Sequence, residues 1–291
     1  MSTSPIPQFL KFSIVMPSLN SELFIEDAIA SVLGQNYDNL EFFIIDGGSR
    51  DKTVEIIKKY ETYIANWVSE PDNGQASAIN KGFRLATGDI FAWLNSDDTY
   101  EPGVFLKVAE RFRQTPRADV VSGCCKLWYN DQRDRLIGPS SLRTYSDFLR
   151  VNSNWMSGRL IIQPEAFFRK AAYTKANGLR EELRYCLDVS LWMEMAKDGC
   201  VFESVNEHWA NLRMHPGQKT FNLARAYHEL LQEAWRRVRN DHEILDDPWT
   251  VATDIVAGWD RLLTETESEA NTLKNSTSYR FGRTLTGLKF W

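Results

Sequence analysis

The feature that most constrains the fold is a regular alternation of short apolar runs and amphipathic segments over the first hundred residues. The apolar runs have the length of strands and are rich in β-branched and aromatic residues, whereas the amphipathic segments repeat apolar residues at helical spacing. This order predicts an α/β fold, with a doubly wound, mostly parallel sheet flanked by helices. The predicted strands are 12–16, 40–45, 64–68 and 90–94, and the predicted helices are 22–35, 52–60 and 75–87.

The alternation becomes less regular after Pro116. We expect one domain in two halves, residues 1–117 and 118–222, followed by a helical C-terminal extension, residues 223–291. Later strands are predicted at 118–127, 135–137 and 201–205, helices at 143–151, 165–176 and 188–198, and helical structure from 223 to about 263.

Composition narrows the class of protein. The hydrophobic fraction of 43% is enough for a packed core, and the net charge of −5 argues against a nucleic-acid partner. The four cysteines form no CxxC pair, which is typical of reduced thiols in a cytoplasmic protein. The N-terminus lacks the basic and apolar parts of a signal peptide, and no apolar run approaches 18 residues. We therefore expect a cytoplasmic protein.

Polar loops follow each of the first four predicted strands, at 17–20, 46–49, 70–74 and 95–98. In an open α/β sheet, ligands bind at the carboxyl ends of the strands. Because parallel strands end at the same edge, the four loops predict one site.

The carboxylates of two of these loops, Asp46 and the Asp97-Asp98 pair, are candidate site residues at that edge. Asp97 and Asp98 are neighbours, which is costly unless a cation lies between them and a substrate, and Mg²⁺ or Mn²⁺ bridging to a phosphate suits such oxygen ligands. A plain polar turn before a helix near Pro102 is the alternative. Asp46 is placed to accept a hydrogen bond from a base N–H, or belongs to a plain turn with Gly47 and Gly48. The chain has no GxGxxG after its first strand and no P-loop motif.

Five segments in this order resemble family 2 glycosyltransferases of the GT-A fold. The resemblance is dense over about residues 12–100 and sparser to about 220, and it rests on the order and spacing of motifs that are individually weak. The segments are SIVMPSLN at 13–20, IASVLGQ at 29–35, IDGGS at 45–49, GQASAINKG at 74–82 and NSDD at 95–98.

The resemblance implies a nucleotide-sugar donor and a divalent ion. Asp46 would bond the imide edge of uracil or thymine, Asp97 would lie on the ribose or sugar side, and Asp98 would bind Mn²⁺ or Mg²⁺. Asn95 stands where the family commonly has an acid. Pro17, Ser18 and Asn20 would line the nucleotide pocket, and Gln75 and Asn80 would lie near the donor.

The same resemblance extends to a second acidic motif around Asp188. The usual Glu-Asp pair is Leu187-Asp188 here, which leaves Asp188 as the candidate base; an N-cap of the following helix is the alternative. A carboxyl group beside Leu191 and Trp192 is expected to have a raised pKa, which suits proton abstraction.

Further residues are expected around the diphosphate and the acceptor. His215 lies in a segment, residues 213–220, that resembles the loop with which relatives reach the diphosphate, and it is assigned to the metal; a surface histidine is the alternative. Gln163 and Trp155 are expected to face the acceptor, although packing is an alternative for Trp155.

These residues predict an inverting glycosyltransferase that uses a nucleotide-diphosphate sugar, with UDP favoured over dTDP. The expected acceptor is a glycan or a lipid-linked molecule in bacterial surface polysaccharide or glycan assembly. Two alternatives are a nucleotide-sugar-binding module with weakened catalysis and a sugar nucleotidyltransferase, although the latter usually has a Gly-rich basic loop after its first strand.

The C-terminal tail has two interpretations. Residues 279–291 place apolar side chains at spacings of four, three and three, with Arg280, Arg283 and Lys289 among them. The tail either docks on the protein or forms an interfacial segment that holds the enzyme at the inner face of the membrane.

Overall fold

A mixed sheet of nine strands forms the centre of the computed structural model, which describes residues 10–129, 134–155, 157–219 and 223–275. The strand order is β3-β2-β1-β4-β8-β6-β9-β5, with β7 paired to β6. The strands are β1 (Phe12–Ser18), β2 (Leu40–Asp46), β3 (Asn66–Ser69), β4 (Ile90–Trp93), β5 (Thr99–Tyr100), β6 (Val120–Trp128), β7 (Arg135–Ile137), β8 (Ala166–Arg169) and β9 (Phe202–Arg213).

The first half of the sheet is parallel, as the sequence predicts. Strand β1 pairs in parallel with both β2 and β4, and β2 pairs in parallel with β3. The carboxyl ends of these four strands therefore lie at one edge. The second half is mixed: β8 is antiparallel to β4 and β6, whereas β9 is parallel to β6.

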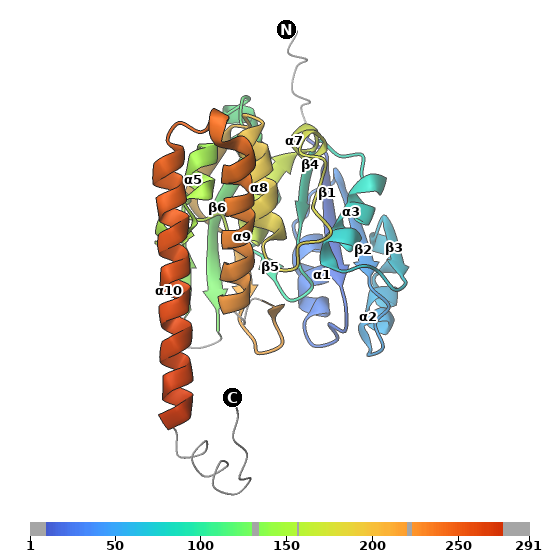
Figure 1. The fold of residues 1–291 in the computed structure, drawn as a ribbon. Coiled ribbons are helices and arrows are strands. Elements are labelled where there is room, and N and C mark those ends of the chain that lie inside the picture. The colour runs from blue at the N-terminus through green and yellow to red at the C-terminus, as the bar shows by residue number, and fades with distance from the viewer. Residues whose placement is uncertain (1–9, 130–133, 156, 220–222, 276–291) are drawn as a thin grey trace, which may run out of the picture.

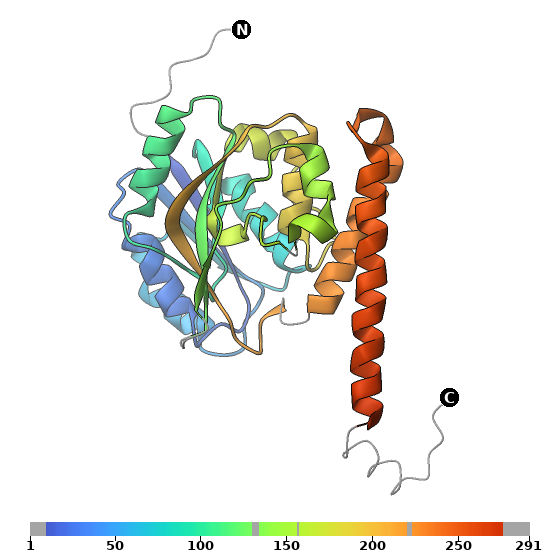
Figure 2. The ribbon, with the colours of Figure 1, turned by 90° about the vertical axis from the view of Figure 1, so that its left-hand side faces the viewer.

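Helices cover both faces of the sheet (Figures 1 and 2). Along β1, Phe12, Ile14 and Met16 pack toward α1, α2 and α4, whereas Val15 packs toward α3 and α8, because side chains alternate along a strand. The helices are α1 (Ile25–Leu33), α2 (Thr53–Lys59), α3 (Gln75–Leu85), α4 (Val104–Gln114), α5 (Tyr145–Leu149), α6 (Val151–Trp155), α7 (Lys170–Lys175), α8 (Leu187–Lys197), α9 (Leu223–Asp241) and α10 (Pro248–Asn275), with 3-10 turns η1 (Glu61–Tyr63), η2 (Gln163–Glu165) and η4 (His242–Ile244).

The predicted helix at 165–176 is wrong in its first half. Residues Ala166–Arg169 form β8, which lies between β4 and β6 and joins the two halves of the sheet. Phe167 and Phe168 are buried on opposite faces, and this fit to a pleated surface outweighs local helix preference. Only Lys170–Lys175 is helical.

Two later elements also differ in extent from their predictions. Strand β9 continues to Arg213 rather than ending at Val205, because it pairs with β6 as far as Trp128 and also with β5. The expected helical segment from 223 is two helices, α9 and α10, with an interruption before Pro248, a residue favoured in the first turn of a helix. The two helices lie side by side on the outside of α5 and α6, away from β3 and α2 (Figures 1 and 2).

Candidate functional site

The loops after β1, β2 and β3 are joined to one another by backbone hydrogen bonds. The Gly47 N–H donates to the Ser18 carbonyl at 2.8 Å, and the Glu70 N–H donates to the Asp46 carbonyl at 3.0 Å. Gly48 adopts a φ of 83° against the backbone of Pro71, a conformation that favours glycine. The parallel pairing of the strands thus brings the predicted loops into one continuous rim.

The Asp46 carboxylate is held by hydrogen bonds from neighbouring residues of the rim. Its carboxylate accepts hydrogen bonds from the Gly48 and Ser49 N–H groups and from the hydroxyls of Ser49 and Ser69. The residue is 1% exposed. Its position at the end of β2 is as expected, but the bonds of its carboxylate go to the loops rather than outward.

The predicted nucleotide-lining residues after β1 differ in exposure. Pro17 and Ser18 are buried, and the Ser18 hydroxyl has no hydrogen-bond partner among the described residues. Asn20 is exposed, has a left-handed φ of 49°, and accepts a hydrogen bond from the Arg50 N–H. All three lie at the rim.

The Asp97-Asp98 turn lies against the end of β9. One oxygen of Asp98 accepts the Arg213 N–H at 3.0 Å, and the other accepts the Asn95 side-chain amide at 3.2 Å. Asp98 is 1% exposed. Burial, and then the charge of Asp97, raises the pKa of the Asp98 carboxyl well above its usual range, although Arg213 and Asn95 oppose this shift.

His215 contacts the other member of this pair. Its Nε2 lies 3.0 Å from an Asp97 carboxylate oxygen, and its ring packs on Phe24. The side chains of His215 and Asp97 are 22% and 23% exposed, so both remain accessible. The structure therefore brings His215 to the predicted metal end of the site, beside Asp97.

A chain of polar contacts connects this turn to α3. Lys219 donates to the Gln75 side chain at 3.1 Å, and Gln75 donates to Asn95 at 2.7 Å. Desolvation, and then the nearby charge of Arg184, lowers the pKa of Lys219, while Asp72, Glu229 and Asp97 oppose that shift. Charged groups from four separate segments thus surround the Lys219 ammonium.

Asp188 lies in the first turn of α8 rather than at its N-cap, which is Cys186. Burial raises the pKa of its carboxyl to about 6, while backbone groups of Asp188 and Val189 oppose the shift. One turn later, Trp192 stacks on Trp93 at the carboxyl end of β4, with ring centroids 5.9 Å apart. Because residues four apart share a helix face, Asp188 lies on the side of α8 that meets the rim.

The chain matches a known protein family over most of the sheet and the rim. Residues 13–175, more than half of the chain, match the family described as Glycosyl transferase family 2. The chain belongs to this family. The predicted sugar nucleotidyltransferase is therefore set aside.

Two curated relatives are glycosyltransferases. An uncharacterised glycosyltransferase of Rickettsia typhi is 26% identical over 214 residues, which cover 72% of this chain and 65% of that protein, slightly less than two thirds of its length. TuaG of Bacillus subtilis, whose name assigns it provisionally to teichuronic acid biosynthesis, is 27% identical over 206 residues, covering 69% and 78% of the two chains.

Two solved structures share the fold at lower identity. TarS residues 1–349 of S. aureus, in complex with UDP-GlcNAc, has a TM-score of 0.65 and 18% identity, covering 93% of this chain and 78% of that one. The mannosyltransferase PcManGT of Pyrobaculum calidifontis, in complex with GDP-Man and Mn²⁺, has a TM-score of 0.60 and 17% identity, covering 96% and 84%. These likenesses confirm the predicted GT-A type of α/β fold.

Of the acidic and His residues at the predicted metal end, only Asp97 and His215 are open to a divalent ion that is shared with a substrate. Protein sites for Mg²⁺ supply one or two carboxylates and leave other positions to water and phosphate. Asp97 and His215 offer an accessible carboxylate and imidazole, whereas both oxygens of Asp98 already accept hydrogen bonds. No cluster of three or more acidic, His or Cys side chains arranged for a metal occurs among the described residues.

The other predicted site residues have mainly structural contacts. Asn80 bonds the backbone of Leu179 and the hydroxyl of Tyr173. Gln163 is buried and donates to the Trp93 carbonyl at 2.6 Å. Trp155 packs near Tyr227 of α9. Their predicted roles toward donor and acceptor stay predictions.

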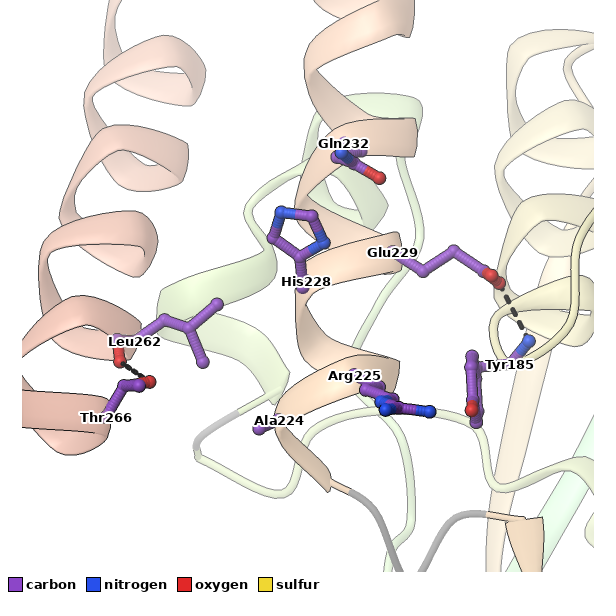
Figure 3. Close-up of a pocket in the computed structure, with 8 residues that line it drawn as sticks. All are labelled: Tyr185, Ala224, Arg225, His228, Glu229, Gln232, Leu262 and Thr266. Carbon is purple, nitrogen blue, oxygen red and sulfur yellow. Dashed lines mark hydrogen bonds between the residues drawn. The ribbon is translucent and has the colours of Figure 1, made fainter. Parts of the chain in front are cut away.

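A groove lies between α9, α10 and the segment before Asp188 (Figure 3). Arg225, His228 and Gln232 of α9, Tyr185, and Leu262 and Thr266 of α10 are among its lining residues. Glu229 turns away from α10 and accepts hydrogen bonds from the N–H groups of Arg184, Tyr185 and Cys186. No sequence pattern indicates this groove, whereas Arg213 and Lys219 lie inside the 213–220 segment, of which only His215 is predicted to be a site residue.

No helix in the described part of the chain is long and apolar enough to cross a membrane. The basic and aromatic tail at 279–291 lies outside the described residues.

Proposed function

We propose that this family 2 protein is an inverting glycosyltransferase that transfers a sugar from a UDP-linked donor to an acceptor hydroxyl. The observation that carries the proposal is Asp188, a carboxyl group with a pKa raised to about 6 on the face of α8 that meets the rim. A base with a pKa near the working pH is suited to accept a proton while remaining largely ionised.

In the proposed reaction, Asp188 accepts the proton of the acceptor hydroxyl. The hydroxyl oxygen attacks the anomeric carbon of the sugar from the face opposite the diphosphate. The bond from that carbon to the phosphate oxygen breaks, and UDP leaves with the electron pair. General base catalysis of this kind contributes roughly 10²- to 10⁴-fold in rate.

The rim supplies the proposed donor site. Pro17, Ser18 and Asn20 line the nucleotide side, and Asp46 fixes the loops beneath it. Asp97, Asp98 and His215 form the proposed metal end, where Mn²⁺ or Mg²⁺ would neutralise charge on the diphosphate. The complexes of TarS with UDP-GlcNAc and PcManGT with Mn²⁺ support both assignments by likeness.

The proposed acceptor is a glycan or lipid-linked molecule of bacterial surface polysaccharide assembly, and the name of TuaG supports this class. The groove beside Tyr185 is the proposed acceptor entry, since it adjoins the segment that carries Asp188. The tail at 279–291 is proposed to contact anionic lipid. Deleting it should lower co-sedimentation with anionic liposomes at low salt but leave donor hydrolysis unchanged; full-length protein that ignores such liposomes would make the tail structural.

The central test compares Asp188→Asn with wild type in the presence of Mn²⁺. We expect UDP release from a UDP-sugar to be lost while UDP binding stays within about twofold, because the carboxylate acts on the acceptor. Asp198→Asn, at the far end of the same helix, is the control and should keep full activity. Substantial turnover by Asp188→Asn would refute the assignment of the base. Tight, metal-free UDP binding by a wild type without turnover would favour the binding-module alternative.

A further inference from the structure

The carboxylate at the end of β2 is largely engaged by the protein itself. Asp46 is 1% exposed, and it accepts three hydrogen bonds at Oδ2, from the Gly48 and Ser49 N–H groups and the Ser69 hydroxyl, and one at Oδ1, from the Ser49 hydroxyl. A second carboxylate, that of Asp72, lies at the same rim, beside Gly47, the residue that follows Asp46.

Gly47 makes room for Asp72. A Cβ atom on Gly47 would lie only 3.0 Å from the Oδ2 atom and 3.3 Å from the Oδ1 atom of Asp72. The Asp72 carboxyl group therefore occupies the space where a side chain at position 47 would begin. Since the Gly47 N–H donates to the Ser18 carbonyl, this space adjoins the end of β1 as well.

The Asp72 side chain is oriented but not saturated. Its Oδ1 accepts the Gly74 N–H at 2.8 Å, which fixes the carboxyl group on the turn before α3. Oδ2 accepts no hydrogen bond from the described residues. The Ser18 hydroxyl, at the end of β1, likewise has no partner among the described residues, although Ser18 is only 5% exposed. A buried polar group without a partner points to a ligand that supplies one.

We propose that Asp72 accepts the ring N–H of the donor base and thereby determines which nucleotide the enzyme takes. Uracil and thymine carry an N–H at ring position 3, which can donate to the Oδ2 atom of Asp72. Cytosine has an unprotonated nitrogen at that position, which repels a carboxylate lone pair. This inference rests on the proposed function, because it assigns a base to the donor site.

The test measures binding of UDP and CDP to the full chain with Mn²⁺, for wild type and Asp72→Asn. Asparagine keeps the shape of aspartate but can donate to the cytosine nitrogen. We expect wild type to prefer UDP, dTDP to follow UDP, and the variant to reduce the UDP-to-CDP affinity ratio by about tenfold or more, in line with the 1–3 kcal/mol of discrimination that a good base-edge contact provides.

Two further variants make the result specific. Glu70→Gln removes a charge from the same loop, but Glu70 pairs with Lys81 on the surface, so the ratio should not change. Gly47→Ala keeps the carboxylate but displaces it, so the ratio should fall without loss of charge, and it provides a second measurement if Asp72→Asn does not fold.

The outcomes separate this inference from the proposed function. A wild type that binds neither nucleotide would contradict the donor site itself. A wild type that binds UDP and CDP equally would overturn the role of Asp72. So would an Asp72→Asn variant that weakens both nucleotides by the same factor, which is the result expected if Asp72 acts only as a counter-ion of Lys219.

Discussion

Replacing Asp188 by asparagine should make the folded protein more stable at neutral pH. Burial raises the pKa of the Asp188 carboxyl from 3.8 to about 6 in the folded chain. The folded state therefore holds this proton more tightly than the unfolded state, and the free energy of unfolding falls as the pH rises from about 4 to about 6. Above pH 6 the cost of ionising this partly buried carboxyl group is present.

The magnitude follows from the difference between the two pKa values, about 2 pH units. At about 1.4 kcal/mol per unit, ionised Asp188 lowers the free energy of unfolding at pH 7.5 by on the order of 3 kcal/mol. Asparagine has the same shape and never ionises. We expect the free energy of unfolding of Asp188→Asn to exceed that of wild type by this amount at pH 7.5 and to equal it near pH 4.

Urea denaturation at the two pH values measures this difference. Asp38→Asn is the control, since Asp38 is exposed and its loss also removes one negative charge from a chain of net charge −5. The control should show little change at either pH. An Asp188→Asn variant that is less stable than wild type at pH 7.5 would refute the reasoning, because it would mean that the ionised carboxylate is stabilised where it lies.

Three further outcomes are expected. Donor turnover should rise about tenfold per pH unit below about pH 6 and then level off in an initial-rate profile, because the base works when ionised; a flat profile from pH 5 to 7 would exclude Asp188. Glu233→Ala should lower the free energy of unfolding, measured in urea, by about 3–5 kcal/mol, because it removes an ion-pair partner of Arg237, whose side chain is only 2% exposed. Glu243→Ala, at an exposed position, is the control and should change the free energy of unfolding little. His215→Asn should raise the Mn²⁺ concentration needed for half-maximal turnover without changing the fold seen by circular dichroism; an unchanged Mn²⁺ requirement would remove His215 from the metal end.

The fold was predictable where its determinants are local. In the first hundred residues each of the first four strands is an apolar run and each helix an amphipathic segment, so the alternation predicts them although β1 pairs with β4 across 78 residues. β8 is different, because Ala166–Arg169 is a four-residue strand that runs directly into a helix and is defined by its pairing with β4 and β6. No pattern within the segment records those partners. The second half of β9 likewise depends on pairing with β6 across 85 residues.

In the candidate site, too, local motifs predict positions but not the contacts that distant segments make with them. The positions of Asp97, Asp98 and Asp188 follow from motifs, but their surroundings come from distant segments. Arg213 reaches Asp98, and His215 reaches Asp97, across more than a hundred residues. Sequence also placed Asp46 at the rim without revealing that its own loops would use its carboxylate, or that the space above Gly47 would admit Asp72.

The helix that follows the second half of the sheet takes part in positioning the proposed base. The Glu229 carboxylate accepts the N–H groups of Arg184, Tyr185 and Cys186, immediately before the first turn of α8. One turn further, Glu233 accepts the Ser190 hydroxyl and pairs with Arg237, which also reaches Glu194. These bonds fix the height and rotation of the α8 turn that holds Asp188. Since the family match ends at residue 175, the base and its support both lie beyond it. Helix α9 therefore belongs structurally with the transferase unit, and a chain shortened before residue 223 should lose the alignment of Asp188 even if the sheet remains folded.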